Sequence, residues 1–233
     1  MAPQSGASRR SLLKGALAVA PAVLVADSPG LARVLQPQEQ EVSTVEDLMR
    51  EHGVLRRVLL IYREAMRRID AKADLPAAAV AGAAGLVRRF VEDYHEKLEE
   101  DYLFPRFRKA ATLVDLVNVL QGQHNQGRVL TSDIQKLTAG AAPANAADRA
   151  RLHERLQLFI RMYAPHAARE DTVLFPAFKT LVSANEYDAL GDEFEKKEQQ
   201  LFGEGGFEKN VQEVAALEKQ IGIYDLAQFT PKL

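Results

Sequence analysis

Four stretches of the chain place apolar residues at alternating steps of four and three, the spacing that lines one face of a helix packed in a bundle. The first stretch should begin at Ser43, because Ser43 and Glu46 have the spacing of a capping box, and it should end near Asp70. Each apolar face also carries a histidine. In chain order, the four stripes are Leu48, His52, Leu55, Leu59, Tyr62 and Met66; Val87, Val91, His95, Leu98 and Tyr102; Val117, Leu120, His124, Gly127, Thr131 and Ile134; and Leu152, Leu156, Phe159, Tyr163, His166, Glu170 and Val173.

Proline and capping residues predict where the other helices begin, bend and end. Pro105 should end or kink the second helix, and Thr112 should cap the third. The fourth helix should begin near Asp148. Pro165 lies inside it and removes one backbone hydrogen bond, which predicts a bend beside His166.

The four helices form an internal repeat. The pattern His-x3-Glu-x4-Phe-Pro-x-Phe occurs at residues 95–107 and again 71 residues later, at 166–178. The lone histidines of the first and third helices, His52 and His124, are 72 residues apart. Each half is therefore one αα-hairpin, and two hairpins that expose apolar stripes can close on each other. We predict an all-α protein, an antiparallel up-down four-helix bundle of two repeated αα-hairpins with extra C-terminal helices.

The last fifth of the chain departs from the repeat. We assign residues 43–180 to the bundle and residues 181–233 to a C-terminal helical extension. Within the extension, residues 183–200 and 207–221 read as helices on either side of a glycine-rich break. We expect them to cover an end of the bundle or to form a subunit contact. The tail, 223–231, is apolar enough to dock on another surface.

Basic and apolar residues at the N-terminus match an export signal. Residues 8–14, Ser-Arg-Arg-Ser-Leu-Leu-Lys, have the twin-arginine pattern, and an apolar run follows over residues 15–26. That run is shorter than the about 20 residues that a membrane span needs. The alternatives are a basic tail or an uncleaved anchor.

The same region predicts the processing and location of the chain. Small residues precede a cut after Ala32, with Ala26 as the second choice. We therefore expect residues 1–32 to be a twin-arginine signal peptide and residues 33–42 to be a linker. The mature protein would be periplasmic or otherwise exported, with no stable membrane span after cleavage.

Composition restricts the kinds of binding site that the chain can form. The 233 residues are 47% hydrophobic and 27% charged, and the formal net charge is −2, as in a globular protein. No basic patch interleaved with aromatic residues points to nucleic acid. Cysteine is absent, which excludes disulfides, thiolate ligands and cysteine nucleophiles. Any metal must be bound by His, Asp or Glu, a donor set that suits iron, manganese or zinc.

The histidines are the strongest functional signal. A lone His on an apolar helical face is usually a core or surface residue satisfied by a neighbour. Here the four bundle helices each carry one, and two of them have a Glu one turn later, on the same face. Burying these groups without coordination would cost several kcal/mol. We therefore predict a metal site between the helices, whereas His153 lies beside its stripe and reads as a surface residue.

Residues 45–178, with this ligand spacing and the paired Leu-Phe-Pro endings, resemble the hemerythrin-like (HHE cation-binding) family. The resemblance implies a four-helix bundle with a non-haem di-iron centre, about two iron ions per chain. The ligand set suits manganese or a mixed-metal site as well. Carried over by position, the terminal ligands would be His52, His95, His124 and His166, and the bridging ligands would be Glu99 and Glu170.

Two positions around this predicted centre have open assignments. Asp171 is the alternative to Glu170, because it has the spacing that the family's oxygen carriers use; the internal repeat favours Glu170. Tyr62 and Tyr163 lie on the stripes, and each reads either as a hydrogen-bond donor to a metal ligand or bridge or as a buried packing residue that donates to the backbone.

One departure from the oxygen carriers bears on function. They have an additional His one turn before the third-helix ligand, where this chain has Leu120. Of about twelve positions on two six-coordinate irons, about four would remain for a bridging oxide or hydroxide, water and an exogenous ligand. The centre should therefore be more open than that of a carrier.

These observations lead to three competing functions. The first is a periplasmic di-iron protein that binds or reacts with O2, peroxide or NO; the sequence does not separate a carrier or sensor from an oxidase or peroxidase. The second is iron donation, scavenging or iron-centre repair. The third is a structural bundle or interaction protein, and for each the chain could form a homo-oligomer.

Overall fold

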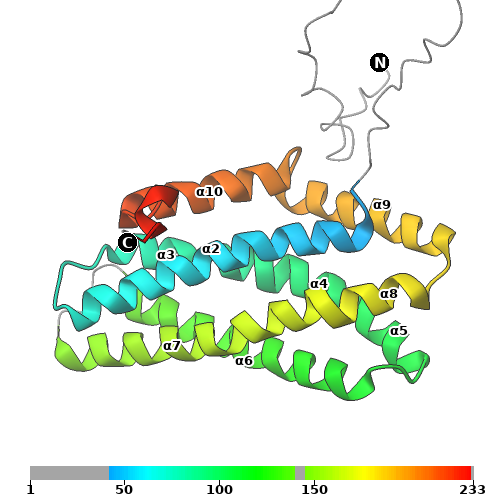
Figure 1. Cartoon of the computed structure of the whole chain (residues 1–233), viewed down its shortest axis with the longest axis horizontal. Coiled ribbons are helices and arrows are strands. Elements are labelled where there is room, and N and C mark those ends of the chain that lie inside the picture. The colour runs from blue at the N-terminus through cyan, green and yellow to red at the C-terminus, as the bar shows by residue number, and fades with distance from the viewer. Residues whose placement is uncertain (1–41, 140–144, 232–233) are drawn as a thin grey trace, which may run out of the picture.

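Helices account for nearly all of the described chain, which comprises residues 42–139 and 145–231 of a computed structural model, and these residues contain no strand. The expected signal peptide and almost all of the expected linker lie outside the described residues. The all-helical prediction is confirmed (Figure 1). The four long helices are α2 (Thr44–Asp70); α3 (Ala77–Leu86) continued by η1 (Val87–His95), α4 (Glu96–Leu98), η2 (Glu99–Leu103) and α5 (Phe104–Lys109); α6 (Val114–Thr138); and α7 (Ala146–Arg169) continued by η3 (Glu170–Leu174) and α8 (Phe175–Leu181).

The predicted start of the first helix is confirmed, and that of the third is wrong. Helix α2 follows Ser43, whose backbone N–H donates to Glu46 Oε2 at 3.4 Å, as in a capping box. Thr112 does not cap α6. The chain reverses with Leu113 in the left-handed region (φ 51°), so Thr112 lies inside the turn and donates to Ala110 O at 3.2 Å instead.

The helices do not end at their prolines. The helix continues beyond Pro105 to Lys109, and α7 stays α-helical through Pro165. Within the four long helices, the departures from α-helical geometry are the wider π-helical segments η1, η2 and η3, of which η2 and η3 begin at Glu99 and Glu170 and lead into the two Phe-Pro pairs. Proline donates no backbone hydrogen bond, so a helix can widen in the turn before it and then continue. The two π-helical turns that precede prolines therefore begin at the candidate bridging glutamates.

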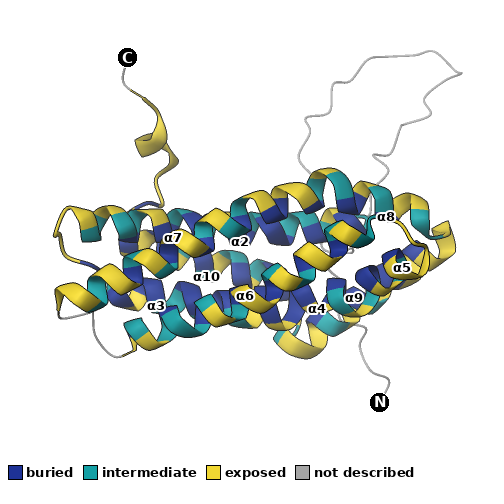
Figure 2. Cartoon of the chain, turned by 90° about the horizontal axis from the view of Figure 1, so that it is seen from below, coloured by how far each residue is buried: buried dark blue, intermediate teal, exposed yellow. Residues whose placement is uncertain are grey.

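Helix α2 packs against α7 and α3, and α6 packs against the same two helices. The second and fourth long helices also meet where α5 contacts α8. Their buried faces enclose a core in which aromatic residues such as Phe90, Phe104, Phe159 and Phe175 are fully buried (Figure 2). None of the helices in the described residues is both long and apolar enough to cross a membrane.

The C-terminal helices lie along the side of this core rather than over its end. Helix α10 (Gly206–Ile221) runs beside α2 and α3, and α9 (Ala184–Phe202) precedes it (Figure 1). Gly82 permits the close approach of α10, because a Cβ at that position would lie 2.5 Å from Leu217 Cδ2. Leu226 and Phe229 in the tail remain 80% and 50% exposed, so most of the tail does not dock on this chain.

Candidate metal centre

The six predicted ligands converge in the core. His52 comes from α2, His124 from α6 and His166 from α7, while His95 ends η1, and Glu99 and Glu170 begin the π-helical turns η2 and η3. Each is at most 4% exposed. Residues far apart in the sequence thus meet at one place, as the repeat predicted.

The imidazoles present their Nε2 atoms to the two carboxylates. His52 Nε2 lies 3.0 Å from His95 Nε2 and 3.3 Å from Glu170 Oε2. On the other side, His124 Nε2 lies 3.4 Å from Glu99 Oε2, and His166 Nε2 lies 3.1 Å from Glu170 Oε2. The carboxylates therefore lie between one pair of histidines from the first hairpin and another from the second.

These donors form two overlapping groups. Within each group, all the ligand atoms lie within 4.8 Å of one another. One group is His52, His95 and Glu99, and the other is Glu99, His124, His166 and Glu170. Glu99 belongs to both. That arrangement fits two adjacent cations that share a carboxylate.

Several of these atoms have no hydrogen-bond partner in the part of the chain that the structure describes. Both oxygens of Glu99, both oxygens of Glu170 and the Nε2 of His124 are buried without a hydrogen-bond partner in the described residues. Buried polar atoms are nearly always hydrogen-bonded, and leaving a charged one unpaired is costly. A cation between the carboxylates would satisfy them, so the donor set fits a metal centre.

Each candidate histidine is oriented from behind by one oxygen. His52 Nδ1 lies 2.7 Å from Asp171 Oδ1, His95 Nδ1 lies 2.8 Å from Glu51 Oε2, and His124 Nδ1 lies 3.1 Å from Glu100 Oε1. His166 Nδ1 lies 2.8 Å from the amide oxygen of Gln123. Since these oxygens accept, Nδ1 carries the proton and Nε2 is left free to bind a metal.

Sequence reasoning missed three of these partners, although a signal was present. Glu51 and Gln123 immediately precede the lone histidines, while Glu100 and Asp171 immediately follow the two bridging candidates. The four partners therefore obey the same internal repeat as the ligands. Each nevertheless contacts the histidine of a different helix, which the sequence alone does not indicate.

The structure also separates Glu170 from Asp171. Glu170 faces the Nε2 atoms of His52 and His166, whereas Asp171 lies on the outer side of His52 and pairs with Arg56. In this geometry Asp171 orients His52, whereas Glu170 lies between two histidines, as the repeat leads us to expect of a bridging candidate.

Neither of the two predicted tyrosine donors makes a hydrogen bond to a candidate ligand in the described residues. Tyr163 donates to Glu96 Oε1 at 2.6 Å, and its ring lies edge-on to His166 with centroids 5.4 Å apart. Tyr62 packs against Phe159, and its buried hydroxyl has no hydrogen-bond partner in the described residues. The groups that do orient the ligands are the acidic and amide side chains behind the histidines.

A buried chain of charges links Tyr163 to this outer layer. Arg128 contacts Glu96 Oε2 at 2.9 Å and Glu100 Oε1 at 2.8 Å, and Glu100 is the partner of His124. Burial raises the pKa of Glu96 to about 8, against the hydrogen bond from Tyr163 and the charge of Arg128, which lower it.

Gly127 makes room for Tyr163, which yields a stability prediction. A Cβ on Gly127 would lie 1.9 Å from Tyr163 Oη, so Gly127→Ala should destabilise the protein by about 1–3 kcal/mol through overpacking. Gly122→Ala is the matched control on α6, because no atom lies within 4 Å of its added Cβ and alanine favours a helix. Urea denaturation measures both, and equal stability of the two variants would contradict the prediction.

The electric fields in the metal-free site push the pKa values of the histidines apart. Burial lowers the pKa of His52, but its hydrogen bond to Asp171 and the nearby carboxylate of Glu170 outweigh that effect and raise the pKa to about 9. Burial dominates at His124 and lowers the pKa to about 4. Burial and the nearby charge of Glu170 raise the pKa of Glu99 well above its ordinary value. A metal cation would replace the proton on Glu99 and would reduce the repulsion between the carboxylates of Glu99 and Glu170.

Stability of the metal-free protein should consequently fall as pH rises from 6.5 to about 9. Folded His52 keeps its proton up to about 9 while the unfolded chain releases it near 6.5, so about 3 kcal/mol of stability is lost across this range. Glu96 acts in the same direction up to about 8. Urea denaturation of chelator-treated protein at both ends of the range measures this fall, and His52→Gln should reduce it. A metal-free wild type that is equally stable at both pH values would contradict the prediction.

His153 stays apart from the centre, as predicted for a surface residue. Its Nε2 lies 3.3 Å from Asp70 Oδ1, and its side chain is 25% exposed.

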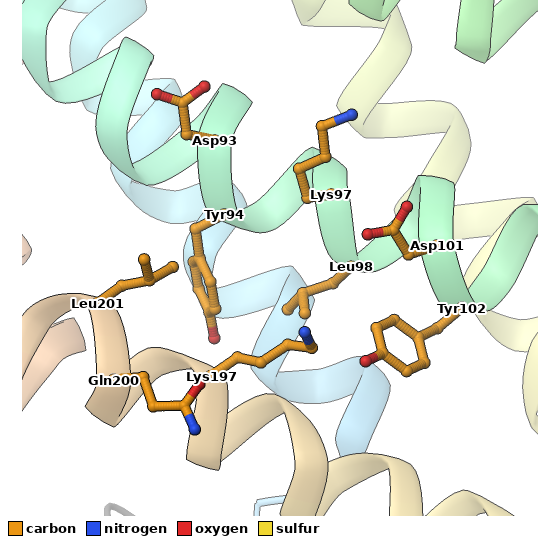
Figure 3. Close-up of a pocket in the computed structure, with 9 residues that line it drawn as sticks. All are labelled: Asp93, Tyr94, Lys97, Leu98, Asp101, Tyr102, Lys197, Gln200 and Leu201. Carbon is orange, nitrogen blue, oxygen red and sulfur yellow. The ribbon is translucent and has the colours of Figure 1, made fainter.

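A surface pocket beside α9 also lies apart from the metal ligands (Figure 3). Its volume is about 260 Å³, and its walls come from the second long helix and from α9. Tyr94 and Tyr102 point toward Lys197 across it (Figure 3). None of the six candidate ligands lines it, so this pocket gives no direct access to them.

Comparisons with known proteins agree with the site. The family model of the hemerythrin HHE cation binding domain matches residues 43–178. Uncharacterized proteins of Mycobacterium bovis and Mycobacterium tuberculosis are each 45% identical over 237 positions, covering 98% of this chain and 93% of the relative. No solved structure matches.

Proposed function

The chain belongs to the hemerythrin HHE cation-binding domain family, and we propose that it holds a di-iron centre that binds or reacts with a small ligand such as O2, peroxide or NO. The observation that carries this proposal is the set of buried oxygens of Glu99 and Glu170, which lack hydrogen-bond partners in the described residues and lie between four converging imidazoles. We further infer that the four long helices form an antiparallel up-down bundle of two repeated hairpins, which brings one ligand pair from each hairpin to the centre.

Each candidate ligand would have a defined position in the centre. His52 and His95 would hold one metal, His124 and His166 the other, and Glu99 and Glu170 would lie between them. When bound, iron would supply reversible redox change and open positions for a diatomic ligand.

The outer residues would orient the imidazoles and set their donor strength. Asp171, Glu51 and Glu100 would make three of them stronger donors through charged acceptors, because such partners raise ligand basicity. The buried aromatic residues around the site, such as Phe104 and Phe175, which stack on His124 and His52, would exclude bulk water.

Metal analysis with optical spectroscopy tests this function. Protein expressed in iron-supplemented cells should contain about two iron ions per chain and, after exposure to air, show near-ultraviolet bands of an oxidised di-iron centre. Adding nitric oxide to the reduced protein should change the spectrum. A well-folded protein with less than one metal per chain would reject the proposal. An iron-loaded protein whose spectrum changes neither on exposure to air nor on addition of nitric oxide would also reject it. Rapid loss of iron to a mild chelator would favour iron donation instead.

We also propose that the protein is exported by the twin-arginine route to the periplasm, on the basis of residues 8–14. This route carries folded proteins, which suits a protein that is loaded with metal inside the cell. Cell fractionation should find the wild type outside the cytoplasm and an Arg9→Lys, Arg10→Lys variant retained inside it. Equal distribution of the two proteins would contradict the assignment.

A further inference from the structure

We propose that small, uncharged ligands reach the centre on the His124–His166 side, through a hollow between α6 and α7 that has Leu120 and Gln123 in its wall. The inference rests on the proposed function and adds to it a path, a preferred metal and the residues that select the ligand.

The hollow reaches a candidate ligand directly. Its volume is about 350 Å³, enough for a diatomic molecule and several waters. Its walls are formed by Asp115, Leu116, Val119, Leu120, Gln123, Pro165, His166 and Arg169. His166 is thus itself part of the wall, and Leu120, one turn before His124, is only 1% exposed.

The centre is covered behind His95. Helices α9 and α10 pack against α2, and carboxylate oxygens of Asp47, Glu51 and Glu198 lie within 4.8 Å of one another, where Glu51 is the partner of His95. Glu198 accepts a hydrogen bond from the backbone N–H of Phe207 at 2.7 Å. The C-terminal helices therefore cover the His95 side, whereas the hollow between α6 and α7 is open at Val119, which is 57% exposed.

The internal repeat does not extend to the charge of the hydrogen-bond partner of His166, and this partner lies in the wall of the same hollow. His95 has a carboxylate partner in Glu51, while the corresponding partner of His166 is the neutral amide of Gln123. A neutral partner polarises the imidazole less than a carboxylate does, so His166 would be a weaker donor and its metal a stronger acceptor for an added ligand. Access and acceptor strength therefore coincide on the His124–His166 side.

The lining indicates the class of ligand. Leu116, Val119, Leu120 and Pro165 are apolar, and the charges of Asp115 and Arg169 are opposite in sign. A hollow of this kind suits a small molecule without net charge, such as dioxygen or nitric oxide, better than a large anion.

The test uses nitric oxide association with the reduced, metal-loaded full chain, measured by stopped-flow absorbance. Val119→Trp should obstruct the mouth and slow association at least about tenfold, a barrier change that leaves metal content intact. Val129→Trp is the matched control: Val129 is also exposed, at 55%, on α6, and the neighbouring hollow that it lines contains no candidate ligand.

A second pair of variants probes the inner wall. Leu120→Phe should slow association as well, whereas Leu48→Phe, at the equivalent position of the first hairpin, should not. Wild-type association rates in both Val119→Trp and Leu120→Phe, or equal slowing by the controls, would overturn the path while leaving the di-iron function standing. A wild type without metal would overturn the function itself, so the two failures are distinguishable. Should Leu120→Phe not fold, the exposed Val119 and Val129 pair decides the question alone.

Discussion

Glu99→Ala protein should retain less than about one metal ion per chain where the wild type binds about two. Glu99 is the residue common to both groups of candidate ligands, so its removal takes a donor from each metal at once. Two adjacent cations would also repel each other more strongly, because the variant lacks the negative charge that the Glu99 carboxylate supplies between them. Elemental analysis of the purified variant measures the loss.

A buried glutamate outside the centre provides the control for this variant. Glu92 is fully buried on the same helix and contacts Arg88 and Thr131, without belonging to either ligand group. Glu92→Gln should therefore keep the wild-type metal content. If Glu99→Ala also retained about two metals with a normal helical circular dichroism spectrum, Glu99 would not be a shared ligand and the proposed centre would be wrong.

Metal loading should raise the melting temperature of the metal-free protein by about 10 °C. A ligand that binds only the folded chain at 100 to 1,000 times its dissociation constant adds about 3–4 kcal/mol, and each kcal/mol moves the melting temperature of a chain of this size by about 2–4 °C. The gain should be large here because the metal also satisfies buried oxygens of Glu99 and Glu170 that otherwise lack partners. Differential scanning calorimetry with and without ferrous iron under anaerobic conditions measures the shift.

The same experiment discriminates specific binding from surface binding. Glu99→Ala should melt at one temperature with or without iron, since its centre cannot hold the pair. Exposed carboxylates elsewhere are unchanged in that variant, so an equal shift in wild type and variant would assign the stabilisation to the surface rather than to the centre. The proposed site would then have no thermodynamic support.

The helices and the six side chains of the candidate centre could be predicted from local patterns in the chain. Stripes at steps of four and three define which face of each helix is buried, and His52, His95, His124 and His166 all lie on those faces. The start of α2 at Ser43 could be predicted for a similar reason, because a capping box involves only neighbouring residues. Local signals failed at Thr112, where the turn geometry prevailed.

The side chains that contact those six residues could not be predicted in the same way, because they depend on how the helices pack. The pairing of Glu51 with His95, of Glu100 with His124 and of Asp171 with His52 joins different helices, and it depends on how far one helix is rotated and shifted against the next. The same packing placed α10 along α2 and left the hollow beside His166 uncovered. Periodicity determines the face that a residue occupies, but the helix that meets this face, and the side chain that reaches across, follow from the three-dimensional packing of the whole chain.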